Sequence, residues 1–144
     1  MQRIDGLANL RILLAEDESL IALNLEMLLQ QFGCEVVGPV SDVSELARVA
    51  MRERLDGALV DVNLRGRQVF EVLPALIERG VPVVLTSGYD DETLFPEEFR
   101  ALPRVSKPFD ERALRRVCLQ AMANGTTTCE GSSGPAVATR AEPT

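Results

Sequence analysis

The sequence predicts an α/β domain, a doubly wound parallel sheet of five strands in the order 2-1-3-4-5. Short apolar runs alternate with amphipathic segments of helical period, which is the pattern of successive β-α units. Hydrophobic residues make up 46% of the chain but aromatic residues only 4%, so the core must be aliphatic, as it is in sheets covered by helices. The 144 residues are enough for one domain with its own core.

Strands are expected where apolar residues run together and a polar or turn residue follows. In chain order these runs are residues 10–15, 35–38, 57–61, 81–86 and 103–106. Gly38-Pro39 is expected to close the second strand. The fourth is wholly apolar until Thr86 and Ser87, as a central parallel strand should be.

Helices are expected where apolar residues recur at every third or fourth position. In chain order these segments are residues 18–32, 43–54, 67–79 and 110–122. Ser41 or Asp42 is placed to cap the second helix, and Pro74 should kink or shorten the third. The apolar pattern is thin over 90–103, which two prolines bracket, so the fourth helix of the fold is expected to be short or irregular.

The two ends of the chain differ in composition from this domain. Residues 1–9 are interpreted as an N-terminal extension and residues 10–122 as the domain itself. Residues 123–144 are rich in Gly, Ser and Thr and have almost nothing to bury, so they are predicted to form a disordered tail.

Charge and composition exclude several classes of function. A formal charge of −7 argues against direct contact with nucleic acid, which needs a basic surface. No apolar stretch approaches the ~20 residues of a membrane helix, so no membrane contact is expected. Three cysteines without Cys-x-x-Cys spacing indicate a reduced, cytoplasmic protein. The absence of histidine excludes a His-based zinc site, a Ser-His-Asp triad and a phosphohistidine donor.

Polar side chains follow four of the five predicted strands. They are Glu16-Asp17, Asp61, Ser87 and Lys107-Pro108. Ligands bind outside the carboxyl ends of parallel strands, so these groups should meet at one edge of the sheet. Clustered carboxylates need a cation to be stable, and hard oxygen ligands with room for water suit Mg²⁺.

Each of these residues has a candidate chemical role. Asp61 can act as a nucleophilic carboxylate that accepts a phosphoryl group, with the backbone carbonyl of Asn63 offered to the metal. The Ser87 hydroxyl could donate a hydrogen bond to a phosphoryl oxygen, and the Lys107 ammonium could neutralise its charge. Pro108 biases the lysine toward extended geometry. Taken singly, each residue also fits ordinary turn or helix-terminus chemistry.

Taken together, these residues resemble the receiver domain of two-component response regulators over the whole predicted domain. The resemblance implies that Asp61 takes a phosphoryl group from a histidine kinase, with Mg²⁺ as cofactor. It implies that Asp17 binds the metal directly and Glu16 mainly through water, while Ser87 and Lys107 contact the phosphoryl group. It further implies a phosphoprotein that signals through partner binding and is no enzyme beyond intrinsic autophosphatase activity.

The chain departs from the family pattern near the output face. Receivers usually carry Tyr or Phe three residues before the lysine, where this chain has Arg104, and Tyr89 could take part of that role. Ser87, Tyr89 and Arg104 are therefore the switch candidates. The string Val84-Leu85-Thr86-Ser87-Gly88-Tyr89 resembles stand-alone receivers from alphaproteobacteria, which are often partnered with HWE-type histidine kinases. The downstream protein is not predicted.

Two other functions stay open. A binding module that works without phosphorylation is favoured by Arg104 and by the weak 90–103 segment, but the acidic cluster argues against it. A small Mg²⁺-dependent phosphatase would also use an aspartate nucleophile. Haloacid-dehalogenase-type enzymes carry theirs in Asp-x-Asp after the first strand, where this chain has Glu16-Asp17-Glu18, and a cap domain is not expected here.

Overall fold

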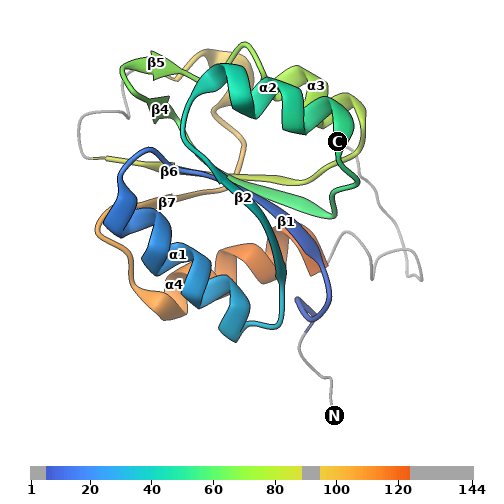
Figure 1. Cartoon of the computed structure of the whole chain (residues 1–144), viewed down its shortest axis with the longest axis vertical. Coiled ribbons are helices and arrows are strands. Elements are labelled where there is room, and N and C mark those ends of the chain that lie inside the picture. Colours follow the sequence, from blue (N-terminus) through green and yellow to red (C-terminus); the bar gives the residue numbers. More distant parts are fainter. Residues whose placement is uncertain (1–5, 89–94, 124–144) are drawn as a thin grey trace.

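A five-stranded parallel sheet forms the centre of the computed structural model, which describes residues 6–88 and 95–123 (Figure 1). In spatial order the strands are β2 (Glu35–Val40), β1 (Arg11–Ala15), β3 (Gly57–Asp61), β6 (Val83–Ser87) and β7 (Arg104–Ser106). Every neighbouring pair in this sheet is parallel. Counted along the chain as the strands of one sheet, this is the predicted 2-1-3-4-5 order, so the predicted fold class is confirmed.

Helices cover both faces of the sheet (Figure 1). On one face lie α2 (Val43–Arg52) and α3 (Leu73–Glu78), and on the other lie α1 (Ser19–Gln31) and α4 (Glu111–Cys118). The chain continues from α4 into a π-helical turn, η3 (Leu119–Ala123). None of the helices in the described part of the chain is long and apolar enough to cross a membrane.

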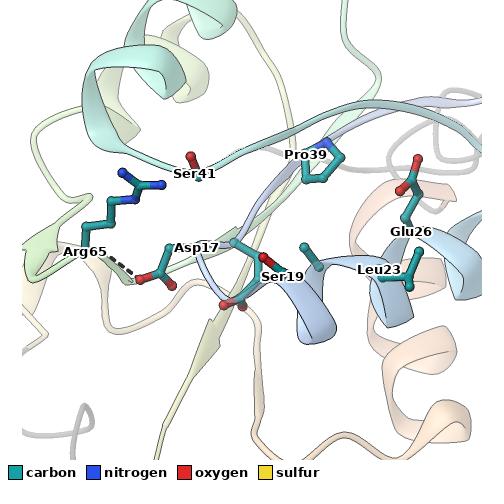
Figure 2. Close-up of a pocket in the computed structure, with 9 residues that line it drawn as sticks. Asp17, Ser19, Leu23, Glu26, Pro39, Ser41 and Arg65 are labelled. Carbon is teal, nitrogen blue, oxygen red and sulfur yellow. Dashed lines mark hydrogen bonds between the residues drawn. The ribbon is translucent and has the colours of Figure 1, made fainter.

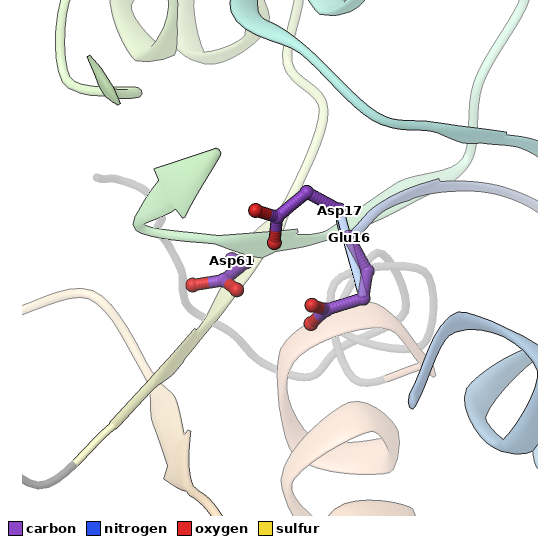
Figure 3. Close-up of side chains that lie close together, drawn as sticks. All are labelled: Glu16, Asp17 and Asp61. Atoms are coloured by element: carbon purple, nitrogen blue, oxygen red, sulfur yellow. The ribbon is translucent and has the colours of Figure 1, made fainter. Parts of the chain in front are cut away.

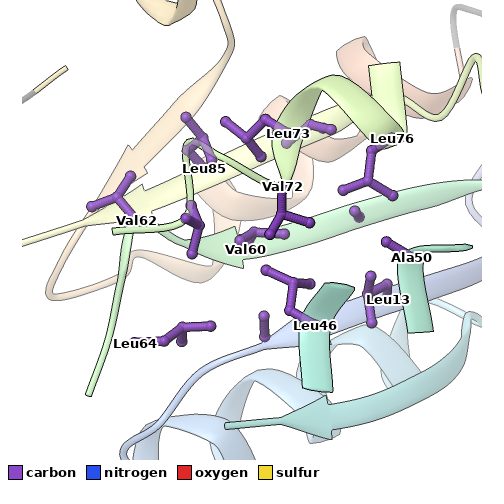
Figure 4. Packing of buried hydrophobic residues seen from close by; sticks show 14 of the residues in the cluster. Leu13, Leu46, Ala50, Val60, Val62, Leu64, Val72, Leu73, Leu76 and Leu85 are labelled. Atoms are coloured by element: carbon purple, nitrogen blue, oxygen red, sulfur yellow. The ribbon is translucent and has the colours of Figure 1, made fainter. Parts of the chain in front are cut away.

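The core consists of two mainly aliphatic clusters, one on each face of the sheet. Leu13, Val60 and Leu85 belong to the cluster under α2 and α3, shown in Figure 4. Their sequence neighbours Leu59 and Val84 belong to the cluster under α1 and α4, because successive side chains of a strand point to opposite faces. β3 and β6 are buried along their whole length, as central strands covered on both faces should be.

The N-terminus of α2 is capped by Asp42, not by Ser41. The Asp42 side chain accepts a hydrogen bond of 2.8 Å from the backbone N–H of Glu45, which satisfies one of the free donors of the first turn. The Glu45 side chain in turn accepts from the backbone N–H of Ser41 at 3.4 Å. This reciprocal arrangement resembles a capping box.

The prediction that the second strand ends at residue 38 is wrong, since β2 continues through Gly38-Pro39 to Val40. The register shifts there, so that Leu13 pairs with Val37 but Ala15 with Val40. β2 is an edge strand, where a proline without an N–H group is tolerated.

The prediction of a helix over 67–79 is wrong in its first half. The chain first forms a short antiparallel hairpin of β4 (Asn63–Leu64) and β5 (Arg67–Gln68). Arg65 and Gly66 have φ angles of 53° and 83°, and two positive angles are what a two-residue type I′ turn requires. The helix begins only at Leu73, with Pro74 in its first turn, where the missing N–H costs nothing.

The segment expected to be irregular contains one 3₁₀ turn, η2 (Glu97–Phe99), within its described part. Tyr89 and residues 124–144 of the predicted 123–144 tail lie outside the described residues. At the other end, residues 6–9 form a turn in which Leu7 is fully buried against the α1–α4 cluster.

We expect Leu59→Ala to lower the free energy of unfolding by about 2–5 kcal/mol, because it leaves a cavity beside the middle of β3. Leu59 is 0% exposed, whereas Leu20 on α1 is 82% exposed. Leu20→Ala should therefore change the free energy by less than about 0.5 kcal/mol. Urea denaturation of both variants measures this, and equal losses would contradict the assigned core.

Candidate functional site

Three carboxylates meet at the carboxyl edge of the sheet (Figure 3). Glu16 and Asp17 follow β1, and Asp61 is the last residue of β3. Because β1 and β3 are neighbours in the sheet, the carboxylates of these residues converge. One oxygen from each lies within 4.8 Å of the others, which is close enough for all three to bind one ion.

Lys107 bridges two of these carboxylates. Its Nζ lies 2.7 Å from Asp61 Oδ2 and 3.0 Å from Glu16 Oε1. Both carboxylate side chains are almost fully buried, while the lysine side chain keeps 20% of its surface exposed. The backbone N–H of Lys107 donates to the carbonyl of Ser87 at 2.9 Å, which ties the lysine to the end of β6.

Backbone N–H groups orient the same two carboxylates. Asp61 Oδ1 accepts from the N–H of Asn63 at 3.1 Å, and Glu16 Oε2 accepts from the N–H of Glu18 at 3.1 Å. Each buried carboxylate thus has one oxygen on the lysine and one on its own following loop. Such bonds hold a charged group in a fixed orientation.

The β4–β5 turn holds the third carboxylate. The backbone N–H of Arg65 donates to Asp17 Oδ2 at 2.9 Å, shown by the dashed line in Figure 2. The turn is itself closed by a 2.8 Å bond from the N–H of Gly66 to the Asn63 side-chain oxygen. The hairpin, which was not predicted from the sequence, is therefore part of the site; Gly66 is the one turn residue that indicates it.

The pairing of the hairpin also directs the backbone of Asn63. The N–H of Val69 donates to the carbonyl of Val62 at 3.0 Å, and Asn63 is paired with Gln68. Hydrogen-bonded and non-bonded pairs alternate in an antiparallel ladder, so Asn63 directs its N–H and C=O away from β5. The N–H goes to Asp61.

Ser87 lies at the end of β6 and is fully buried. Its neighbour Thr86 is paired with Asp61 in the sheet, so Ser87 points to the opposite face. Its hydroxyl has no hydrogen-bond partner within residues 6–88 and 95–123. The structure thus brings Glu16, Asp17, Asp61 and Lys107 together and leaves the Ser87 hydroxyl out of direct contact with them.

Arg104 lies on β7, at the position where receivers usually carry an aromatic residue. The centre of its guanidinium group is 4.4 Å from the centroid of the Phe95 ring, a cation–π contact. Phe95 in turn contacts Phe70 edge to face, with 5.4 Å between centroids, and Phe70 stacks on Phe99 at 5.6 Å. Phe95 was not predicted as a site residue, since nothing in its local sequence pattern indicates a partner on a distant strand.

Burial shifts the ionisation of the site. Burial raises the pKa of Glu16 from 4.5 to about 7, and the nearby charge of Asp61 adds to the shift, against the bonds to Glu18 and Lys107. Burial also raises the pKa of Asp61, although its bonds to Lys107 and Asn63 oppose this. Burial alone would lower the pKa of Lys107, but its bonds to the two carboxylates raise it. The carboxylates are therefore short of positive charge.

The donor set fits a hard divalent cation. Three carboxyl groups face one ammonium at the cluster, and all their oxygens are of the type that Mg²⁺ prefers. A cleft of about 310 Å³ lies beside Asp17, between the start of α1 and the end of β2 (Figure 2). Ser19, Leu23 and Glu26 of α1 line one side of it, and Glu16 and Asp17 of the acidic cluster line it as well.

The chain matches known proteins in both sequence and fold. Residues 12–118 match the family model described as the response regulator receiver domain. The chain is similar to the solution structure of SdrG from Sphingomonas melonis Fr1, with 34% identity and a TM-score of 0.71 over 79% of this chain and 96% of that one. It is also similar in fold to the receiver domain of a sensor histidine kinase from Pseudomonas aeruginosa, with 23% identity and a TM-score of 0.70 over 80% and 98% of the two chains.

Curated relatives match over part of their length. The phyllosphere-induced regulator PhyR of Methylorubrum extorquens is 30% identical over 114 residues, which is 77% of this chain and 43% of that protein. The transcriptional regulatory protein PdtaR of Mycobacterium tuberculosis is 28% identical over 102 residues, or 69% and 50%. The chain thus spans about half the length of the curated relatives it matches.

In metal-free protein, we expect the free energy of unfolding to fall as the pH rises from 4.5 to about 7. Over this window the folded protein keeps a proton on Glu16 that the unfolded chain has released. The contribution of this one group is about 3 kcal/mol at most. Glu16→Gln should reduce the slope and be more stable than the parent above pH 7.

Urea denaturation in EDTA at a series of pH values measures this slope. Glu78→Gln, at an exposed residue of α3, is the control and should keep the parent's slope. A slope in Glu16→Gln equal to that of the parent would contradict the raised pKa.

Proposed function

The chain belongs to the response regulator receiver domain family, and on that premise we propose that it is a single-domain response regulator whose Asp61 accepts a phosphoryl group. The observation that carries this proposal is the convergence of Glu16, Asp17, Asp61 and Lys107 at one edge of the sheet. Three carboxylates and an ammonium around one reactive oxygen are suited to phosphoryl transfer, which depends on positioning and charge neutralisation.

The proposed donor is the phosphohistidine of a histidine kinase. A carboxylate oxygen of Asp61 attacks the phosphorus, and the bond from phosphorus to the imidazole nitrogen breaks. The nitrogen keeps the electron pair, and the product is an aspartyl phosphate. Lys107 neutralises charge on the acceptor, and the bond from Asn63 fixes one oxygen so that the carboxylate is held in one orientation.

We further propose that Glu16, Asp17 and Asp61 hold Mg²⁺, together with the backbone carbonyl of Asn63. The P. aeruginosa receiver is described as having a magnesium ion coordinated in its active site cleft, which supports the same ion here. Bound Mg²⁺ would supply the positive charge that the carboxylates lack and that a phosphoryl group would also need. The Arg65 N–H keeps Asp17 turned toward the cluster for this purpose.

We propose that phosphorylation of Asp61 is sensed on the other face of β6, where Ser87 lies. Leu85 is paired with Arg104 and Ser87 with Ser106, so Ser87 and Arg104 share a face of the sheet. A turn of the Ser87 hydroxyl toward the phosphoryl group would change the packing on that face, where Arg104 holds Phe95. Tyr89, the third switch candidate, lies outside the described residues. A two-state surface of this kind is the general logic of phosphorylation switches.

The partners follow from the family. We propose a histidine kinase as phosphodonor, of the HWE type by the resemblance of the Val84–Tyr89 string, and an unidentified protein as the downstream target. The similarity to the phyllosphere-induced regulator PhyR supports a regulatory role rather than an enzymatic one, and we propose at most intrinsic autophosphatase activity. We propose a cytoplasmic phosphoprotein organised as an extension over 1–9, a receiver domain over 10–122 and a tail over 123–144.

Incubation with acetyl phosphate and Mg²⁺ should add one phosphoryl group to the protein. The reason is that Asp61 is held as a nucleophile in a site that lacks positive charge until Mg²⁺ binds. Intact-mass spectrometry measures the adduct. Asp61→Asn, which keeps the shape but removes the nucleophile, should show none, and neither should the parent in EDTA.

An adduct of equal yield on Asp61→Asn would contradict the assignment of the acceptor. No adduct on the parent would favour the phosphorylation-independent binding module. Steady turnover of p-nitrophenyl phosphate would instead favour a small phosphatase.

A further inference from the structure

The Lys107 side chain has to pass over a strand to reach its partner. Lys107 follows β7 and Asp61 ends β3, and β6 lies between these two strands in the sheet. The 2.7 Å contact between Nζ and Asp61 Oδ2 therefore spans the carboxyl end of β6. A side chain at the end of β6 that points to the same face therefore lies beneath the Lys107–Asp61 contact.

That side chain belongs to Thr86. Thr86 is paired with Asp61 on one side and with Val105 on the other, so its side chain shares their face of the sheet. Lys107, two residues after Val105, is on this face too. The next β6 position on the face, Gly88, has no side chain. Thr86 is thus the one polar side chain that β6 offers directly below the lysine.

The Thr86 hydroxyl is buried but makes no hydrogen bond within the described residues. The residue is 1% exposed, and its Oγ1 has no hydrogen-bond partner in the described part of the chain. A buried hydroxyl without a partner lowers stability, and valine has the same shape without this cost. The hydroxyl is better explained by a second state of the site in which it has a partner.

Binding of a cation at the acidic cluster would make the Lys107 ammonium available as that partner. In this structure the Lys107 ammonium donates to Asp61 and forms an ion pair with Glu16, two of the three carboxylates proposed to hold Mg²⁺. A cation at these oxygens competes with the ammonium, which can only donate hydrogen bonds and so needs another acceptor. We propose that Thr86 is a positioning residue for Lys107, and that its Oγ1 accepts an ammonium N–H when the cation binds. This inference rests on the proposed function.

The test is a Mg²⁺ titration of the intact chain, followed by amide NMR shifts, so it needs no phosphoryl transfer. Thr86→Val should weaken Mg²⁺ binding by about a factor of five, the worth of roughly one hydrogen bond. Thr86→Ser keeps the hydroxyl and loses only a methyl group, so it should bind Mg²⁺ nearly as the parent does. Ser106→Ala removes an exposed hydroxyl from the other face of β7 and is the matched control.

Parental Mg²⁺ affinity in Thr86→Val would overturn the inference and leave the proposed function standing. Equal weakening in Thr86→Val and Thr86→Ser would also overturn it, because packing and not the hydroxyl would then be responsible. A parent protein that binds no Mg²⁺ would contradict the proposed metal site itself and the role of Thr86 with it.

Discussion

The Lys107 ammonium lies between two buried carboxylates, 2.7 Å from Asp61 and 3.0 Å from Glu16, and the rest of the site depends on this bridge. Burial raises the pKa of both Glu16 and Asp61, and the ammonium opposes these shifts without cancelling them. The site is therefore held together but left short of positive charge. In the proposed function, a cation and an incoming phosphoryl group would act on the same few oxygens, and loading would therefore change how the lysine is held.

Much of this arrangement could be predicted from the sequence, because it follows from two repeated rules. Apolar runs alternating with helical periods determine the β-α order, and right-handed crossovers then place β1 beside β3. Polar residues that end such runs must meet at one edge of the sheet. Ser87 was predicted together with Glu16, Asp17, Asp61 and Lys107 on that ground. The structure brings the four charged side chains together but leaves the Ser87 hydroxyl out of direct contact with them. Their roles in phosphoryl transfer stay predictions.

The features that could not be predicted depend on backbone choices or on distant contacts. The β4–β5 hairpin requires a positive φ at Arg65, a conformation that arginine rarely adopts, so the segment resembles the start of a helix. The strand that continues past Gly38-Pro39 depends on its place at the sheet edge, which local pattern does not reveal. The contact of Arg104 with Phe95 joins two separate elements, and the position of Thr86 below Lys107 depends on strand register.

The most direct test of the account is whether the acidic cluster and Lys107 respond together to a phosphoryl-like ligand. Amide NMR spectra of the protein with Mg²⁺, recorded before and after addition of beryllofluoride, measure this response. We expect large amide shifts at Asp61, Ser87 and Lys107 that require Mg²⁺ and are absent from Asp61→Asn. Unchanged spectra in the presence of both reagents would contradict the claim that this edge of the sheet is a phosphoryl-accepting site.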